Sequence, residues 1–345
     1  MKHLLVLVGP GNDFKNKFSE RFSNSACHPP NTLLGMKFKR IGDRIFLSQP
    51  KHINHGLEEL GLTKCKPSST PLTPNLQLRE ALDEDHEKFK KLNINYQSAI
   101  DLLHYIASNT QPDLTFAVSS LACYSIKPGL SHWKEVKKTW QYLCHTKDLK
   151  FTINPVKPSE FFSIFSNATW GNDPDSRTFQ SGYLCYLFGS LVSWNSCRQL
   201  SITYSSTKAE LNPLVESFHE GLWLKALINE MWHLQIESAS HFIDDPELIQ
   251  QLTVDNKTFK ERYCTNDLID NKGLNDKLKK FGTNSKTRHI DLRTKCFCQE
   301  IKNKNIKITL FQTQDMTADA LTKPTSIEPL KNLTKTIDPD FNHQI

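Results

Sequence analysis

Long apolar runs are missing from this sequence, and their absence argues against a protein with membrane-spanning helices. No stretch approaches the roughly 20 apolar residues that a membrane-spanning helix needs. The N-terminal apolar run Leu4–Val8 is short, and Pro10 and Gly11 follow it closely. This pattern is typical of a buried strand and not of a secretory signal peptide. We therefore expect no membrane partner.

Regularly spaced cysteines are missing as well. The nine cysteines are an odd number without a repeated short spacing, and Cys296 and Cys298 are the only close pair. This distribution excludes a disulfide framework and a set of zinc ligands. It indicates reduced thiols in an intracellular protein of the cytoplasm or nucleus.

The chain has little excess of either charge. Its 43 Lys and Arg against 37 Asp and Glu give a net charge of +6, which is compatible with a polyanionic partner but does not require one. The basic residues gather between Lys272 and Lys304. Such a cluster can be a solvated face, or it can neutralise the phosphates of a nucleic acid. The candidates for phosphate contact are Lys277, Lys279, Lys280, Lys286, Arg288 and Arg293.

The 345 residues are enough for two domains, and the sequence pattern changes several times along them. Within 1–70, alternation over Asn31–Gln49 predicts a hairpin that turns near Gly42. Residues 71–95 are polar and of mixed charge, which predicts an exposed linker. Over 96–150, apolar residues recur at helical spacing. The strand patterns of 151–325 follow, and 326–345 is expected to be a tail.

The pattern from residue 151 onward predicts the order βββαβααβα. Pro213 is expected to kink the long helix or to delay its first turns. Residues 235–265 are polar, so we expect the fourth strand after them. The expected elements are strands at Phe161–Trp170, Gly182–Phe188, Leu191–Tyr204, Asp267–Asp270 and Ile306–Gln312, and helices from Ser205 or Ser206, around 274–281, at His289–Lys302 and at Met316–Leu321.

Acidic residues fall in this order where phosphodiester hydrolysis by two metal ions needs them. Two Mg²⁺ ions roughly 4 Å apart require three or four carboxylates that converge from separate elements. Position 167 lies on the first strand, Glu210 near the start of the long helix and Asp319 on the last helix. A further Asp is needed at the end of the fourth strand, and either Asp255 or Asp270 could supply it.

Three motifs resemble signatures of the ribonuclease H of copia-type LTR retrotransposon Pol polyproteins. They are SSTKAE at Ser205–Glu210, TRHID at Thr287–Asp291 and ADALTKP at Ala318–Pro324. The segments Leu34–Pro71 and Tyr96–Thr146 are similar to the later reverse-transcriptase and connection parts of the same polyprotein.

The resemblance implies an α/β fold: a ribonuclease H-like mixed five-stranded sheet with flanking helices at 151–325. A truncated reverse-transcriptase palm remnant at 1–70 and a helical thumb- or connection-like segment at 96–150 would precede it. It also implies Mg²⁺ as cofactor and an RNA/DNA hybrid as substrate, whose RNA strand is hydrolysed.

The resemblance also selects the third carboxylate. The family places this Asp 19 residues before the His of the TRHID motif, which is the distance from Asp270 to His289. The implied metal ligands are therefore Glu210, Asp270 and Asp319. Asp255 would then lie in a loop of unusual length, and His289 is expected to pack or to begin a helix.

The chain departs from the family pattern at two catalytic sites. The first strand reads SNATW where the family has SDADW, so Asn167 replaces the Asp that resembles the ligand of both metal ions. Asn offers a neutral oxygen instead of a shared charge, and we expect hydrolysis to be impaired. Met1–His3 stands where the family carries the polymerase carboxylates, so we expect no DNA synthesis. The alternative function is a non-catalytic nucleic-acid-binding or interaction module that keeps the fold.

The departures share one mutational pattern. Gln97, Gln111 and Cys144 stand where the family pattern has Arg, and Asn167 stands where it has Asp. A single C-to-T or G-to-A transition accounts for each of these changes. We therefore hypothesise that cytosine deamination altered this copy.

Overall fold

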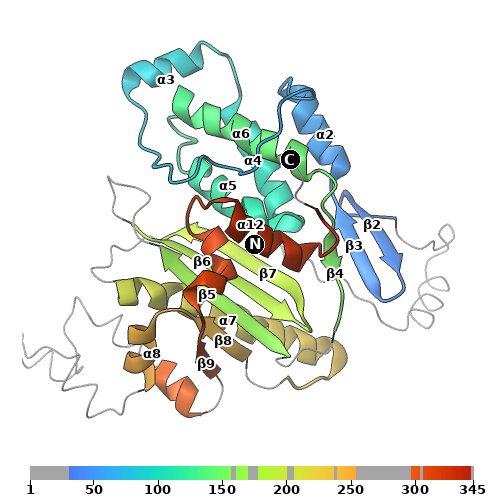
Figure 1. Cartoon of the computed structure of the whole chain (residues 1–345), viewed down its shortest axis with the longest axis vertical. Coiled ribbons are helices and arrows are strands. Elements are labelled where there is room, and N and C mark those ends of the chain that lie inside the picture. Colours follow the sequence, from blue (N-terminus) through green and yellow to red (C-terminus); the bar gives the residue numbers. More distant parts are fainter. Residues whose placement is uncertain are drawn as a thin grey trace, which may run out of the picture.

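The computed structural model describes residues 31–156, 161–169, 178–199, 206–236, 239–253, 297–303 and 306–342. Two sheets and a layer of helices make up this part of the chain (Figure 1). The predicted strands at Leu4–Val8 and Asp267–Asp270 and the helix around 274–281 lie outside the described residues. None of the described helices has the length and hydrophobicity needed to cross a membrane.

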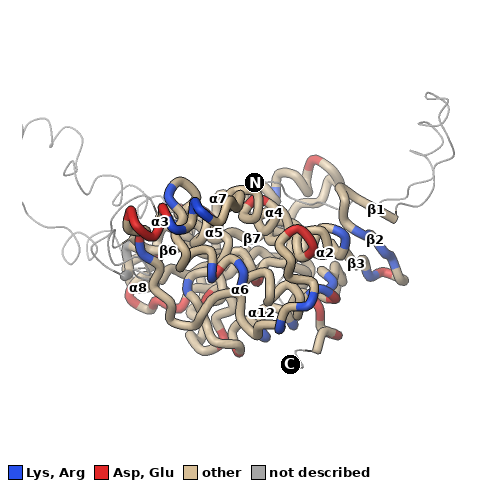
Figure 2. Tube along the Cα trace, turned by 90° about the horizontal axis from the view of Figure 1, so that it is seen from above, with Lys and Arg blue, Asp and Glu red and all other residues tan. Residues whose placement is uncertain are grey.

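The smaller sheet contains the predicted hairpin. Strands β2 (Met36–Ile41) and β3 (Arg44–Ser48) pair antiparallel, and Gly42 in their turn has a φ of +59°, which glycine adopts without strain. Strand β1 (Thr32–Leu33) extends one edge, and β4 (Phe151–Ile153) pairs with β3 at the other. Basic residues lie along β2 and β3 (Figure 2). The pairing of β4 joins the start of the second half of the chain to this hairpin.

The helices of the first half form one apolar core. The predicted apolar positions of 96–150 all lie in it, which confirms the helical reading; examples are Leu103, Trp133 and Trp140. The elements are α2 (Pro50–Glu59), α3 (Asp83–Lys90), α4 (Tyr96–Asn109), η1 (Pro112–Leu114), α5 (Thr115–Ala122) and α6 (Leu130–Thr146).

The larger sheet is mixed and five-stranded, as predicted. Its strand order is β7-β6-β5-β8-β9. The first three strands in the chain pair antiparallel, whereas β8 runs parallel to β5 and β9 parallel to β8. The strands are β5 (Phe162–Thr169), β6 (Gln180–Leu187), β7 (Ser190–Arg198), β8 (Ala239–Ile243) and β9 (Ile306–Leu310).

Helices cover both faces of this sheet. Tyr183 and Cys185 of β6 pack with Leu224 of helix α7 (Ser206–Trp232) on one face. Leu184 and Tyr186 point to the other face and join a core that contains α12 (Ile327–Ile337). Because successive side chains of a strand alternate between faces, a strand covered on both sides is buried throughout. The burial pattern of β6 follows this rule, since all but its last residue are buried.

The fourth strand differs from the prediction. The strand between β5 and β9 is β8, which lies in the stretch 235–265 that the sequence pattern indicated to be polar. Helix α8 (Pro246–Thr253) follows it directly. Ala239, Ser240 and His241 are not strong strand formers, yet all three are buried in the sheet between β5 and β9. Pairing between distant segments therefore outweighed local propensity here.

The segment expected to be a C-terminal tail is part of the core. Helix α12 buries Leu330, Leu333 and Ile337 in a cluster that also contains Leu47 of the small sheet and Leu184 of the large one. Ahead of it, the predicted short helix is present as the 3-10 helix η3 (Thr317–Leu321). The C-terminal helix thus packs where the two sheets meet.

Candidate active site

Strand β5 carries the first predicted site residue, Asn167. Its side chain is buried, and the residue pairs with Gly182 of β6. The Asn167 amide nitrogen donates a hydrogen bond to Oδ1 of Asp319. A carboxylate at this position could only accept hydrogen bonds, whereas Asn donates one to its neighbour. The predicted first and last carboxylate positions are therefore in direct contact.

Glu210 lies near the start of helix α7 and reaches the same strand. Its Oε2 accepts the backbone N–H of Ala168 at 2.8 Å. This N–H is available because the pairing of β5 with β8 ends at Phe165 and Phe242. Beyond Phe165, Glu210 therefore takes the place of a β8 residue as hydrogen-bond partner of β5, and it lies beside Asn167.

The side chain of Gln199, which directly follows strand β7, supports the start of α7. Pro213 has no N–H, so the carbonyl of Ala209 lacks its usual helical donor. Nε2 of Gln199 donates to this carbonyl at 3.0 Å, and Nδ2 of Asn212 donates to Oε1 of Gln199 at 2.7 Å. The helix begins at Ser206 and continues through Pro213, so the predicted delay of its first turns is not found.

Asp319 is held by contacts of the segment that contains η3. Its Oδ2 forms an ion pair with Nζ of Lys323 at 2.6 Å. The hydroxyls of Thr322 and Thr169 lie 2.8 Å apart and tie this segment to β5. Gly182 allows the close approach, since a Cβ there would lie 2.8 Å from the Cβ of Leu321.

A carboxylate that the sequence patterns did not select completes the group. Asp244 follows the last residue of β8 and accepts a hydrogen bond from Thr313. Its neighbour Asp245 has a different role, because its Oδ1 accepts the backbone N–H groups of Glu247 and Leu248 at 2.8 and 2.9 Å and so caps α8. Asp244 is thus the member of the pair that faces Asp319.

Burial and mutual repulsion make this group costly to ionise. Burial raises the pKa of Glu210 well above its usual range, and the charges of Asp244, Asp245 and Asp319 raise it further, against the hydrogen bond from Ala168. Burial also raises the pKa of Asp244, and Asp319 adds to this rise, while Lys323 lowers it. Strongly shifted carboxyls that face each other from separate elements are typical of functional sites.

The described residues do not fit a pair of Mg²⁺ ions. Among them, no three His, Cys, Asp or Glu side chains are arranged to hold a metal ion. Asn167 turns its amide nitrogen to Asp319, and Lys323 engages the other oxygen of Asp319. Mg²⁺ requires near-octahedral oxygen ligands, so both contacts would have to break before Asp319 could bind it with both oxygens.

Curated relatives align with nearly the whole chain. The Pol polyprotein of the transposon TNT 1-94 from Nicotiana tabacum is 28% identical over 313 residues, which is 90% of this chain and 21% of that protein. The Pol polyprotein of transposon RE2 from Arabidopsis thaliana is 27% identical over 92% of this chain and 20% of its own length. The chain is similar to the Pol polyproteins of copia-type retrotransposons. It spans about a fifth of the length of these relatives.

Two other comparisons add little to the identification as a copia-type Pol sequence. No family model matches the chain. The crystal structure of ribonuclease H1 from Halobacterium salinarum covers 47% of this chain and 93% of its own, with 13% identity and a TM-score of 0.29. The ribonuclease H-like character therefore rests on the strand order and on the family.

Several residues that the copia-type motifs selected lie outside the described part. These are the third carboxylate Asp270, its alternative Asp255, His289 and the whole predicted phosphate-contacting set Lys277, Lys279, Lys280, Lys286, Arg288 and Arg293. Asn167, Glu210 and Asp319 are brought together. Asp244 was missed, although an apolar Phe-Ile pair followed by two Asp residues was a signal for a strand that ends in carboxylates.

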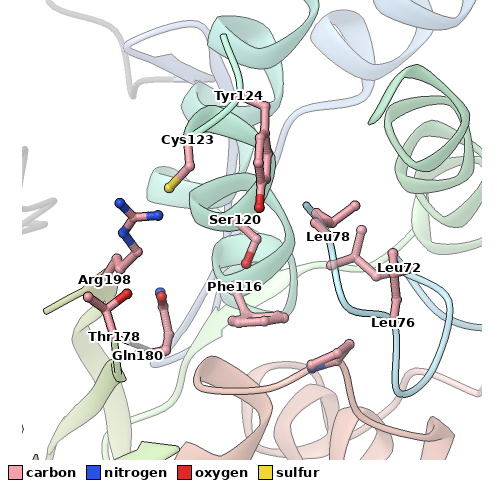
Figure 3. A pocket seen from close by; sticks show the side chains of 11 residues that line it. Leu72, Leu76, Leu78, Phe116, Ser120, Cys123, Tyr124, Thr178, Gln180 and Arg198 are labelled. Carbon is pink, nitrogen blue, oxygen red and sulfur yellow. The ribbon is translucent and has the colours of Figure 1, made fainter. Parts of the chain in front are cut away.

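A hollow lies beside this site, between the helices of the first half and the larger sheet. It has a cavity of about 50 Å³ and a largely apolar floor. Figure 3 shows the guanidinium of Arg198 pointing toward Cys123 across its rim. Gln180 lines it and is paired with Thr169, two residues from Asn167. The other lining residues are Leu72, Leu76, Leu78, Phe116, Ser120, Tyr124, Thr178 and Pro324.

Proposed function

We propose that this chain carries a ribonuclease H site that ancestrally hydrolysed RNA in RNA/DNA hybrids with two Mg²⁺ ions and is now impaired. The observation that supports this is the contact between Asn167 and Asp319. This contact joins the first and the last acidic positions of the family pattern, but at the first one an amide donor stands in place of a carboxylate. The fold and the acidic side chains of a nuclease are present without its central charge.

The remaining acidic residues are of the type that metal-assisted hydrolysis uses, but the described ones do not form a metal site as they stand. Glu210, Asp319 and either Asp244 or Asp270 are the proposed metal ligands. Asp244 lies at the end of the strand parallel to β5, close to Asp319. Asp270 is proposed from the family spacing alone. Asp244→Asn and Asp270→Asn separate the two assignments, because metal binding should fall only in the variant that lacks a ligand.

The nucleic-acid partner is part of the same proposal. A hybrid that reaches Asn167 needs cations along its backbone, because phosphate neutralisation supplies most of the affinity. We propose that Lys277, Lys279, Lys280, Lys286, Arg288 and Arg293 contribute to this role. Among the described residues, Arg198 lies at the rim of the hollow next to the site and is exposed.

A second candidate function is a binding module without catalysis. Lys323 favours it, since its ammonium places a positive charge among the acidic residues of the site. Such a site attracts a phosphate more readily than one with four unpaired carboxylates, because like charges repel. The module would bind a hybrid without cleaving it.

Cleavage of a labelled RNA/DNA hybrid in Mg²⁺ separates these functions. The protein is compared with Asn167→Asp and with Asn167→Asp combined with Glu210→Gln, which serves as the inactive control. Cleavage that appears only in Asn167→Asp supports the impaired nuclease. Binding of the hybrid by both forms without cleavage by either supports the module. Equal cleavage by the protein and by Asn167→Asp would overturn the proposed impairment.

A further inference from the structure

Both oxygens of Asp319 are engaged by side chains of this chain. Oδ1 accepts the amide of Asn167, and Oδ2 forms the 2.6 Å ion pair with Lys323. The side chain of Asp319 is 15% exposed, so this ion pair is shielded from water on one side. A partly buried carboxylate with two such partners is stable without any further cation.

The backbone around Lys323 is anchored on both sides. Thr322 donates its N–H and its hydroxyl to the carbonyl of Asp319 at 3.1 and 3.2 Å. On the other side, the carbonyl of Pro324 accepts the N–H of Asn75 at 3.2 Å. The fold therefore fixes the backbone of Lys323, and this places its ammonium within reach of Asp319.

We propose that Lys323 is a built-in cation of this site and competes with divalent metal ions for Asp319. The inference deepens the proposed function, because it concerns the same carboxylates. A divalent ion bound to Asp319 would lie a few ångström from the ammonium. At 4 Å in water, a charge of two against a charge of one costs about 2 kcal/mol, and more where water is excluded. Metal binding therefore requires Lys323 to leave Asp319.

Binding of Mn²⁺ to the full chain tests the proposal without any measurement of cleavage. The free ion is followed by electron paramagnetic resonance in titrations of the protein, Lys323→Met, Asn167→Asp and the double variant. Met keeps the aliphatic stem of Lys and removes its charge. Lys331→Met is the matched control, since Lys331 pairs with Glu328 at 3.2 Å on α12, within the same kind of local ion pair.

Lys323→Met is expected to bind Mn²⁺ roughly thirtyfold more tightly than the protein, the factor that corresponds to about 2 kcal/mol. The double variant is expected to bind more tightly than either single variant. Lys331→Met should leave the affinity unchanged. Equal affinity in Lys323→Met, Lys331→Met and the protein would overturn the proposal, and so would absence of binding by the double variant.

Folding and the proposed function are controlled separately. Circular dichroism confirms the fold of each variant, and Lys323→Gln provides a second charge-removing variant if Met at this position prevents folding. A protein that cleaves hybrids as well as Asn167→Asp does would refute the impairment but not the competition. Unchanged Mn²⁺ affinity would refute the competition and leave the cleavage result standing.

Discussion

The hydroxyl of Tyr142 donates a hydrogen bond to Oδ2 of Asp113 at 2.6 Å inside the helical layer. Among the described residues, Oδ1 of Asp113 has no hydrogen-bond partner. Burial raises the pKa of Asp113 from 3.8 to about 6, and the hydrogen bond from Tyr142 opposes this rise. Ionisation of the Asp113 carboxyl is therefore less favourable in the folded protein than in the unfolded chain.

Asp113 is expected to make the protein less stable as the pH rises. Its folded pKa lies above the unfolded value, so its contribution is fully present below about pH 4 and is lost as the pH rises through 6. Between pH 5 and 7.5 the free energy of unfolding should fall by about 1–2 kcal/mol more than in Asp113→Asn. Urea titrations at the two pH values measure this difference. Asp148→Asn, an exposed change in the same layer, should behave like the unaltered protein.

His241 is expected to have the opposite effect. Burial in strand β8 lowers its pKa from 6.5 to about 3, and neither ring nitrogen has a hydrogen-bond partner in the described part of the chain. The unfolded chain takes up a proton below 6.5 while the fold does not, so stability is lost as the pH falls. The free energy of unfolding should be about 2 kcal/mol lower at pH 5 than at 7.5 on this account.

His241→Leu should remove this loss in acid, because Leu does not titrate. Urea titrations at pH 5 and 7.5 again provide the measurement. The exposed His104 offers the matched control His104→Leu. An acid loss of the same size in His241→Leu and in the protein would contradict the assignment.

The hydrogen bond from Gln199 to Ala209 is expected to stabilise the protein more when residue 213 is Pro than when it is Ala. Gln199→Leu should lower the free energy of unfolding by about 2 kcal/mol, since buried groups lose their partners. In a Pro213→Ala background, residue 213 regains its N–H and can bond to Ala209 itself. The cost of Gln199→Leu should then be about 1 kcal/mol smaller. Equal costs in the two backgrounds would mean that Gln199 does not compensate for the proline.

Glu210→Gln is expected to stabilise the protein. The Gln oxygen can still accept the N–H of Ala168, and the substitution removes a buried charge whose pKa is raised by burial and by Asp244. The gain at pH 8 should be about 1–3 kcal/mol, because the charge is no longer forced into a desolvated site. Thermal unfolding measures it, with Glu328→Gln on the exposed face of α12 as control. A loss of stability would contradict the prediction and show that the Glu210 carboxylate stabilises the fold despite its burial.

Much of the second half could be predicted because its elements carry their own local patterns. The three antiparallel strands are rich in aromatic and branched residues, and Gly189 lies in the turn between the last two. In the first half, the regular spacing of Trp133, Trp140 and Leu143 likewise predicted a helix, and these three side chains lie in the core. Such patterns depend on neighbours in the chain, so they are visible without the fold.

The fourth strand could not be predicted in the same way. Strand β8 has few strand-forming residues, and its place between β5 and β9 comes from parallel partners far away in the chain. Asp244 was missed for the same reason, since an Asp is recognised at the end of a strand only when the strand is. The assignment of Asp270 remains a prediction.

The sequence by itself determined that position 167 is Asn where the family has Asp, and that Glu210 and Asp319 are available for the same site. Only the tertiary structure decided how Asn167 is used. Its amide contacts Asp319, more than 150 residues later in the chain, and Lys323 takes the other oxygen of that carboxylate. Residue identity is a property of one position, whereas hydrogen bonds and charge balance depend on segments that only the packing of β5, α7, β8 and η3 brings together.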